Sequence, residues 1–483
     1  KLPRVRYFSM YHYIICYNWT RKKGESMVFS SLTFLFAYLP VVMLVYFISP
    51  LKYRNFILLL VSLFFYGWGE PIYIFIMIAS IVVNWIFAFP INKYRDTNKE
   101  KAKTWLILCI VFNLSLLGFF KYWDFLAEFI PFIKPVGVSL PIGISFYTFQ
   151  TMSYPIDLYR KETHIQNSLI NFGAYVSMFP QLIAGPIVRY VDIEKQLNNH
   201  PVTETRFYEG IQRFIIGLSK KVLLANNTGK VFEEISRLTI SNQSVVSAWI
   251  GIIAYAFQIY FDFSGYSDMA IGLGKMLGFE FPENFNYPYI AKSITDFWRR
   301  WHMTLSYWFR DYVYIPLGGN RKGKKRQIIN ILIVWLLTGL WHGASWNFIL
   351  WGLFYGIVLL FEKLFFKKYL DKLPDFFKHL YTIVIVLIAW VLFAFTDLSK
   401  GLHYLSLLFG GAKFINGYAI YFLRDNALLF LICFIASTPI AKTKFNFITK
   451  HEYFVPVCVL LLLFICTSFI VDASYNPFLY FRF

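Results

Sequence analysis

The sequence predicts an all-helical protein that crosses a membrane about ten or eleven times, in spans of roughly 20 residues. Two observations support this fold class. Hydrophobic residues make up 57% of the 483 residues and charged residues only 15%, which leaves too little polar surface to cover a water-soluble body. The apolar residues also gather into long runs separated by polar loops. A lipid bilayer is therefore the expected surrounding, and disordered, coiled-coil and collagen-like classes are excluded.

The apolar runs define the expected spans in chain order. Several are shorter than the roughly 20 residues of an upright span, so they need protein cover, a thinned bilayer or a re-entrant path. The chain shows no internal repeat, and we expect a single membrane domain over residues 27–483 with its core motifs at 139–362. The runs lie at residues 31–48, 56–68, 72–89, 105–120, 206–224, 246–261, 327–361, 380–395, 427–441 and 454–471.

Loop charge indicates the orientation of the spans. Lys and Arg number 47 against 27 Asp and Glu, and the basic loops at residues 92–103 and 320–327 are expected on the cytoplasmic side. Counting the spans backwards from the first loop then places the basic residues 1–26 outside, against the rule that basic segments face the cytoplasm. Either these residues are no part of the mature chain, which would start at Met27, or an interfacial helix is missing from the count. The positive charge faces anionic lipid and needs no nucleic acid partner.

Several common site chemistries lack their motifs. The five cysteines are scattered without zinc spacing, so neither a metal site nor a disulfide framework is expected. The sequence has no phosphate-binding loop, no H-E-x-x-H helix and no G-x-S-x-G turn, which argues against a nucleotide-driven pump, a zinc protease and a serine hydrolase. Asp262 and Asp268 do not share a helix face as a carboxylate pair. We expect one or both to hold an arginine or to line a cavity.

Two stretches carry helix breakers at membrane depth. Residues 138–160 contain Pro141, Gly143 and Pro155 among hydroxyl and amide side chains, and residues 180–190 contain further proline and glycine. Broken backbone is tolerated in a bilayer only where protein or a water-filled cavity satisfies its polar groups. The two stretches indicate either such a cavity or a pair of kinked structural helices.

Residues 283–321 alternate charged and aromatic side chains, as an amphipathic helix at the level of the lipid headgroups does. Asp296 stands at helical spacing from Arg299 and Arg300, so these charges either neutralise one another or serve a site. His302 follows them. It can orient another catalytic group, position an acyl donor or cap the helix, and the sequence alone leaves these roles open.

His342 is the strongest single candidate for a catalytic residue. It lies in GLWHGASW within the apolar run 327–361, about 21 Å along a helix from the basic loop and thus well inside a hydrocarbon core of about 30 Å. The basic flanks of the run predict a hairpin with His342 near its apex. An ionisable residue there is a functional candidate, and the alternative is a neutral imidazole that only bonds a carbonyl. A neutral imidazole can take a proton from an attacking hydroxyl and pass it to a leaving thiolate, as acyl transfer requires.

Six segments carry the most distinctive motifs, and they occur in order over most of the chain. They are MVFSSLTFLFAYLP from Met27, LPIGISFYTFQTMSYPIDLYR from Leu140, FPQLIAGPIVRY from Phe179, YFDFSGYSDMAIGLG from Tyr260, ENFNYPYIAKSITDFWRRWHMTLSYWFRDYVYIPLGGNR from Glu283, and GLWHGASWNFILWG from Gly339. Together they resemble the bacterial alginate O-acetyltransferase branch of the membrane-bound O-acyltransferase superfamily. The resemblance is weakest after about residue 370.

The resemblance implies a horseshoe-like bundle with re-entrant and interfacial helices around a tunnel, a catalytic His342, and His302 as a helper in the same site. It implies that an acetyl group passes from a cytoplasmic donor, acetyl-CoA, across a bacterial plasma membrane to an extracytoplasmic polysaccharide such as alginate. A secreted or membrane-tethered acetyltransferase often completes this transfer. No bound cofactor is expected. The further candidates for the tunnel or the donor site are Trp298, Arg299, Trp301, Trp341, Asn347 and Asp262.

Two other functions stay open. A related protein transfers D-alanine to teichoic acid from a carrier protein, and the segments at Met27 and His302 favour acetyl over D-alanyl transfer. A transporter or scaffold without chemistry of its own is the other alternative, and it predicts that His342→Ala leaves surface acylation intact. The acceptor is open among alginate, other exopolysaccharides, peptidoglycan and teichoic acids, because the sequence shows no specificity pocket.

Overall fold

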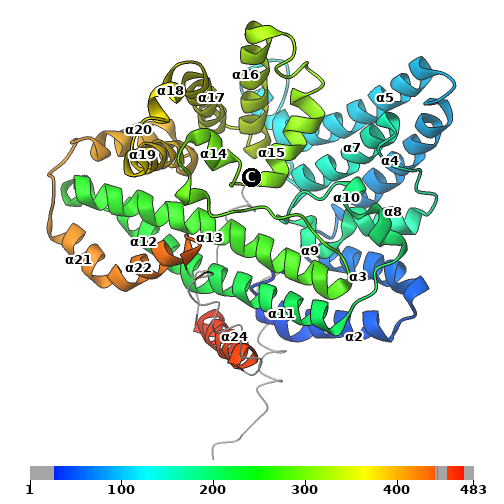
Figure 1. Cartoon of the computed structure of the whole chain (residues 1–483), viewed down its shortest axis with the longest axis horizontal. Coiled ribbons are helices and arrows are strands. Elements are labelled where there is room, and N and C mark those ends of the chain that lie inside the picture. Colours follow the sequence, from blue (N-terminus) through cyan, green and yellow to red (C-terminus); the bar gives the residue numbers. More distant parts are fainter. Residues whose placement is uncertain (1–26, 441–442, 444–453, 473–483) are drawn as a thin grey trace, which may run out of the picture.

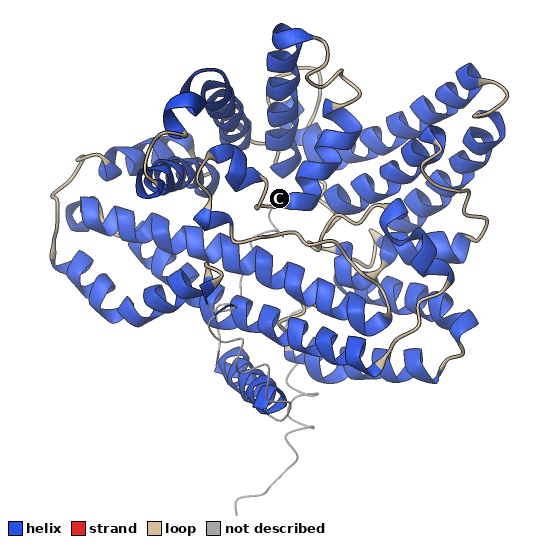
Figure 2. Ribbon diagram, viewed as in Figure 1, coloured by secondary structure: helices blue, strands red, loops and turns tan. Residues whose placement is uncertain are grey.

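A computed structural model of the chain describes residues 27–440, 443 and 454–472 (Figure 1). Over these residues the fold is helical, and its only strand-type pairing is an isolated bridge between Ser244 and Lys413 (Figure 2). The predicted all-helical class is confirmed. Residues 1–26, for which the sequence analysis made a prediction, are outside the described residues.

The first half of the chain forms helices whose starts follow from the sequence. Asn98, Ser168 and Thr203 each accept a hydrogen bond from the backbone N–H three residues later, which caps α5, α8 and α11. The helices are η1 (Phe34–Tyr38), α2 (Leu39–Ile48), η2 (Leu51–Tyr53), α3 (Arg54–Gly69), α4 (Ile74–Tyr94), α5 (Lys99–Leu117), η3 (Gly118–Tyr122), α6 (Trp123–Ala127), α7 (Ile144–Arg160), α8 (Leu169–Ser177), α9 (Phe179–Leu182), α10 (Tyr190–Asn198), α11 (Glu204–Ser219), η4 (Lys220–Ala225) and α12 (Asn226–Ser236).

The second half contains the longest helix, α13, which Ser244 caps at its start and Gly278 ends in a left-handed conformation with φ of 93°. The helices here are η5 (Ile240–Asn242), α13 (Val245–Leu277), η6 (Pro288–Ile290), α14 (Ile294–Trp298), α15 (Met303–Phe309), η7 (Arg310–Tyr314), α16 (Gly323–His342), α17 (Trp346–Phe361), η8 (Glu362–Phe366), α18 (Lys367–Leu370), α19 (Asp375–Ala394), α20 (Leu398–Leu408), α21 (Gly417–Asp425), α22 (Ala427–Ala436) and α24 (Phe454–Asp472).

Six of the described helical segments are long and apolar enough to cross a membrane, and the pair α21 and α22, bent by 57°, makes a seventh if it counts as one span. The six are α4, α5 to α6, α13, α17 to α18, α19 and α24. Other predicted runs form shorter helices, such as Phe34–Ile48. The multi-pass character is therefore confirmed, while the count of ten or eleven crossings stays a prediction.

Helix α11 packs against the C-terminal half of the long helix α13 (Figure 1). Glycines allow this approach: a Cβ atom on Gly265 would lie 2.7 Å from the carbonyl oxygen of Gly217, and one on Gly272 would lie 2.6 Å from that of Gly210. Figure 1 shows α16 standing between the group of α4, α5 and α7 and the group of α17 to α20.

The run at 327–361 folds as the predicted hairpin. Helix α16 ends at His342, α17 begins at Trp346, and the two helices pack against each other. Their contact depends on Gly339 and Gly352, because a Cβ atom on Gly339 would overlap the carbonyl oxygen of Phe348 and one on Gly352 would overlap that of Trp335.

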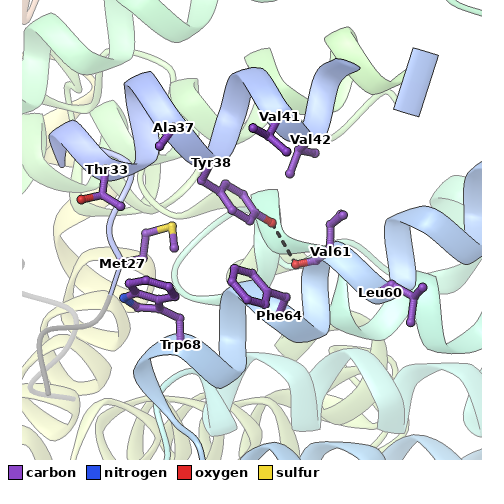
Figure 3. A pocket seen from close by; sticks show the side chains of 10 residues that line it. All are labelled: Met27, Thr33, Ala37, Tyr38, Val41, Val42, Leu60, Val61, Phe64 and Trp68. Atoms are coloured by element: carbon purple, nitrogen blue, oxygen red, sulfur yellow. Dashed lines mark hydrogen bonds between the residues drawn. The ribbon is translucent and has the colours of Figure 1, made fainter. Parts of the chain in front are cut away.

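An apolar cavity of about 490 Å³ lies between the N-terminal helices and α3 (Figure 3). Its lining offers few polar groups, and the hydroxyl of Tyr38 is engaged with the carbonyl oxygen of Val61 at 2.9 Å. None of its lining residues belongs to the elements that hold His302 or His342, so the cavity is no candidate for the expected tunnel. It is lined by Met27, Thr33, Ala37, Tyr38, Val41, Val42, Leu60, Val61, Phe64 and Trp68.

The close contact in the hairpin gives a first prediction. We expect Gly339→Ala to destabilise the protein by about 1–3 kcal/mol, because the added methyl group overpacks the backbone of α17. The measurement is the thermal unfolding midpoint of the detergent-solubilised protein. Gly417→Ala is the matched control, since a Cβ atom there meets open space. Equal midpoints for the two variants would contradict the packing described for α16 and α17.

Candidate active site

His342 is the last residue of α16 and is 3% exposed. Its imidazole is surrounded by aromatic rings, with centroid distances of 5.0 Å to Trp341, 4.9 Å to Trp351 and 5.2 Å to Phe393. The helix ends here because the next residue, Gly343, is extended and lets the following helix approach: a Cβ atom on Gly343 would overlap the ring of Phe348. The sequence thus places one ionisable ring in an apolar, protein-covered surrounding.

His302 lies at the break between α14 and α15 and is 1% exposed. Its backbone is left-handed, with φ of 43° and ψ of 54°, a conformation that costs a residue with a side chain roughly 1–2 kcal/mol. This break divides residues 294–309 into two short helices, so the single amphipathic helix expected in this segment is not formed. Its imidazole does not cap α15. Strain at one buried histidine is typical of a functional position.

Trp341 brings the two predicted histidines together. Its ring centroid lies 5.0 Å from that of His342 and 5.8 Å from that of His302. The indole is also held by α7, because its Nε1 donates to the carbonyl oxygen of Ser145 at 3.4 Å. Trp341 was one of the predicted site residues, and it is the common neighbour of both histidines.

Asn284 fixes the tautomer of His302, although no pattern in the sequence singled it out. Its Oδ1 lies 3.1 Å from His302 Nδ1, 2.9 Å from Thr304 Oγ1 and 3.4 Å from Thr304 N. A backbone N–H can only donate, so the atom that faces it is the amide oxygen, and His302 Nδ1 must donate to the same oxygen. Nε2 of His302 therefore carries a lone pair, and it has no hydrogen-bond partner among the described residues.

Trp298 is linked to His342 through Trp351, whose ring centroid lies 5.7 Å from that of Trp298 and 4.9 Å from that of His342. Trp298 and Trp301 are buried in a second aromatic cluster, with Trp298 4.6 Å from Trp335 and Trp301 4.9 Å from Trp390 between ring centroids. Asn347 is fully buried, and its Nδ2 donates to the carbonyl oxygen of Leu392 at 3.3 Å.

The predicted charged residues form ion pairs or face outward. Asp262 is buried and pairs with Lys221 at 2.7 Å rather than with an arginine, whereas Asp268 does hold an arginine, Arg213, at 2.6 Å. Arg299 is exposed, and its neighbour Arg300 takes the predicted pairing with Asp296, at 2.9 Å. Within the described ranges, no group of three His, Cys, Asp or Glu residues could hold a metal ion.

The geometry at Asn284 gives a prediction that needs no assay of activity. We expect nuclear magnetic resonance of ¹⁵N-histidine-labelled protein to show His302 protonated at Nδ1, because the amide oxygen of Asn284 accepts that proton. Asn284→Ala removes the acceptor and should convert the signal to a mixture of tautomers, while Asn347→Ala should leave it unchanged. The resonance of His302 is assigned by its loss from the spectrum of the His302→Gln variant. A wild-type His302 protonated at Nε2 would contradict the tautomer inferred here.

Comparison with known proteins places this geometry in a family. The family described as MBOAT, membrane-bound O-acyltransferase family, matches residues 160–403, which include both histidines. A protein of Pseudomonas putida named "Probable alginate O-acetylase AlgI" is 38% identical over 498 residues, which cover 95% of this chain and 100% of the relative. The peptidoglycan O-acetyltransferase of Helicobacter pylori is 36% identical over 445 residues, which cover 84% and 83%.

A teichoic acid D-alanyltransferase of Bacillus subtilis is more distant, at 30% identity over 287 residues that cover 57% of this chain and 72% of the relative. The resemblance seen in the six sequence segments is thereby confirmed. With two buried histidines on a shared tryptophan, a multi-pass helical body and relatives that match almost the whole chain, the protein belongs to the membrane-bound O-acyltransferase family of enzymes.

Proposed function

We propose that the protein is a membrane O-acetyltransferase that esterifies hydroxyl groups of an extracytoplasmic polysaccharide. Two of the relatives are named for acetylation of alginate and of peptidoglycan, and they match this chain over most of its length. The single observation that supports the proposal best is the meeting of His302 and His342 on Trp341, where both imidazoles are buried. Buried ionisable groups in an apolar site are typical of acid–base catalysis.

The reaction that fits this site is acyl transfer from a thioester to an alcohol. The hydroxyl oxygen of the acceptor attacks the acetyl carbonyl carbon while His342 takes the hydroxyl proton. A C–O bond forms, the C–S bond of the donor breaks, and the proton passes from His342 to the leaving sulfur. The products are an acetyl ester and a free thiol, so the step needs no oxidant, reductant or metal ion.

His302 acts as the helper of this step. Because Asn284 holds its Nδ1 proton, the lone pair on Nε2 can accept a hydrogen bond from the acceptor hydroxyl or from the donor. The aromatic rings around both histidines limit the access of water, which would otherwise hydrolyse the thioester. In this account Trp341 separates and orients two imidazoles that serve the same substrate.

The donor is a cytoplasmic acyl thioester, and acetyl-CoA is the candidate that we propose. Arg321 and Lys322 precede α16, and Lys324, Lys325 and Arg326 lie in its first turn. Such a basic cluster attracts a donor that bears phosphates. The protein would reside in the plasma membrane of a bacterium, with the donor inside and the glycan outside. A secreted or membrane-tethered acetyltransferase is the proposed partner for the final transfer to the glycan.

D-alanyl transfer to teichoic acid is the second candidate, favoured by the likeness to the Bacillus subtilis enzyme. Both reactions break a thioester and form an ester, so the same two histidines would serve either one. The candidates differ in the group that alkali releases from the cell-surface polymer, which is acetate in one case and D-alanine in the other.

The proposed function predicts that base-labile acetate on the cell-surface glycan depends on His342. We expect His342→Ala to reduce the rate of acetylation by about 10² to 10⁴, since the step loses its general base. The measurement compares acetate released by alkali from washed glycan at matched membrane abundance. His164→Ala is the control, because the side chain of His164 is 88% exposed.

Acetate at the wild-type level in the His342→Ala strain would remove His342 from the mechanism. Loss of esterified D-alanine instead of acetate in that strain would transfer the proposal to the teichoic acid reaction. Acetate that is unchanged even in a deletion strain would contradict the acetyltransferase function itself.

A further inference from the structure

The end of helix α16 is closed by two consecutive side chains from another part of the chain. The last carbonyl groups of any helix lack partners inside that helix. In α16 the carbonyl oxygen of Leu340 accepts a hydrogen bond from the Tyr122 hydroxyl at 2.7 Å, and the carbonyl oxygen of Trp341 accepts one from the Lys121 amine. These carbonyls belong to the two residues directly before His342. We call Lys121 and Tyr122 the clasp.

The backbone of η3 explains how neighbouring residues can reach neighbouring carbonyls. Residues 118–122 form a π-helical turn between α5 and α6, and such wide turns within helices occur frequently at functional sites. In a regular α-helix, successive side chains diverge by about 100°. Lys121 and Tyr122 are the last two residues of this π-helical turn, and both reach the end of α16.

Lys121 is buried, with 8% of its surface exposed, inside the apolar helical segment Lys99–Ala127. A lysine in that position is costly and needs compensating interactions. Its amine also contacts Ser145 Oγ at 3.0 Å and lies 5.8 Å from the centroid of the Trp341 ring. The negative end of the α16 dipole favours a cationic group there.

Ser145 links Lys121 to the Trp341 ring. Its Oγ accepts from Lys121, and its carbonyl oxygen accepts from the indole nitrogen of Trp341. Three helical segments, η3, α7 and α16, are thereby joined at the residue before His342. The clasp bonds the backbone of Leu340 and Trp341, while Ser145 bonds the Trp341 ring.

We propose that the clasp is a positioning device that holds the end of α16 so that His342 and the Trp341 ring face the reacting groups. The inference rests on the proposed catalytic function of His342. Lys121 and Tyr122 are positioning residues in this account, because their polar atoms are engaged with the helix end and not with substrate.

The first test measures backbone order at the helix end without any substrate. Hydrogen–deuterium exchange of the purified protein in detergent would be followed in peptides that cover residues 338–348. We expect Lys121→Met to speed exchange there, because the end of α16 frays once the carbonyl of Trp341 loses its partner. Lys134→Met is the matched control, since Lys134 is exposed and follows the same segment. Exchange equal to wild type in Lys121→Met would overturn the clasp.

The second test uses acetyl transfer by the reconstituted protein from acetyl-CoA. Loss of the amine should lower kcat by about 10- to 100-fold, as expected for a charge-assisted hydrogen bond, and loss of the Tyr122 hydroxyl by about 2- to 10-fold. The KM for the donor should stay within about twofold of wild type, since the clasp does not bind the donor. Lys121→Arg keeps a donor to the carbonyl and should retain more activity than Lys121→Met.

A selective rise in KM, with kcat unchanged, would show that Lys121 binds the donor, and this would overturn the positioning role. If Lys121→Met fails to accumulate, Tyr122→Phe removes a single hydroxyl and decides the question by the same exchange and kinetic measurements.

The two tests separate this inference from the proposed function. Faster exchange in Lys121→Met together with full activity of His342→Ala would leave the clasp in place and remove the catalytic assignment. Unchanged exchange in Lys121→Met together with an inactive His342→Ala would overturn the clasp and leave the catalytic assignment of His342 in place.

Discussion

The site depends on one constraint, namely that helix α16 ends inside the protein body and not at its surface. A helix end in a water-poor surrounding exposes carbonyl groups that must find partners. The carbonyl groups of Leu340 and Trp341 accept hydrogen bonds from side chains of η3, and the Trp341 indole donates one to a backbone carbonyl of α7. The segments that satisfy the helix end therefore also hold Trp341, the neighbour of both histidines. The structural requirement and the assembly of the site are met by the same contacts.

Aromatic packing explains how two imidazoles can be buried side by side with one tryptophan. Aromatic residues make up 21% of the chain, and many of them pack around the histidines. Trp341 belongs to the larger hydrophobic cluster built mainly from the N-terminal half, while Phe348 and Trp351 belong to the cluster around α13, α17 and α19. His342 thus lies at the boundary between two packed bodies, a common place for a substrate site.

Hydropathy was sufficient to predict the helical membrane body, and a single imidazole in an apolar run was sufficient to predict that His342 lies buried at the apex of a helix hairpin. The hairpin of α16 and α17 also followed from the basic flanks of that run. The number of crossings stays a prediction, because an apolar run such as 31–48 has the same hydropathy whether its helix crosses the bilayer or packs part-way through it. The left-handed break at His302 was equally hidden, since propensity favours a helix through this segment.

The supporting residues escaped prediction for a different reason. Lys121 and Trp341 are 220 residues apart in the chain, and Asn284 reaches His302 only because the chain turns back between them. Local patterns contain no information on such contacts. The partner of Asp262 was equally beyond local patterns: an arginine was expected, and the carboxylate is found paired with Lys221.

We propose that His302, His342 and Trp341 surround the reacting carbonyl group. The most direct test is an experimental structure with a stable acetyl-CoA analogue in which a methylene group replaces the thioester sulfur. Our account predicts that the ketone of the analogue lies beside Trp341 and within hydrogen-bonding reach of at least one of the two histidines. A well-defined analogue whose ketone lies away from both imidazoles would contradict it.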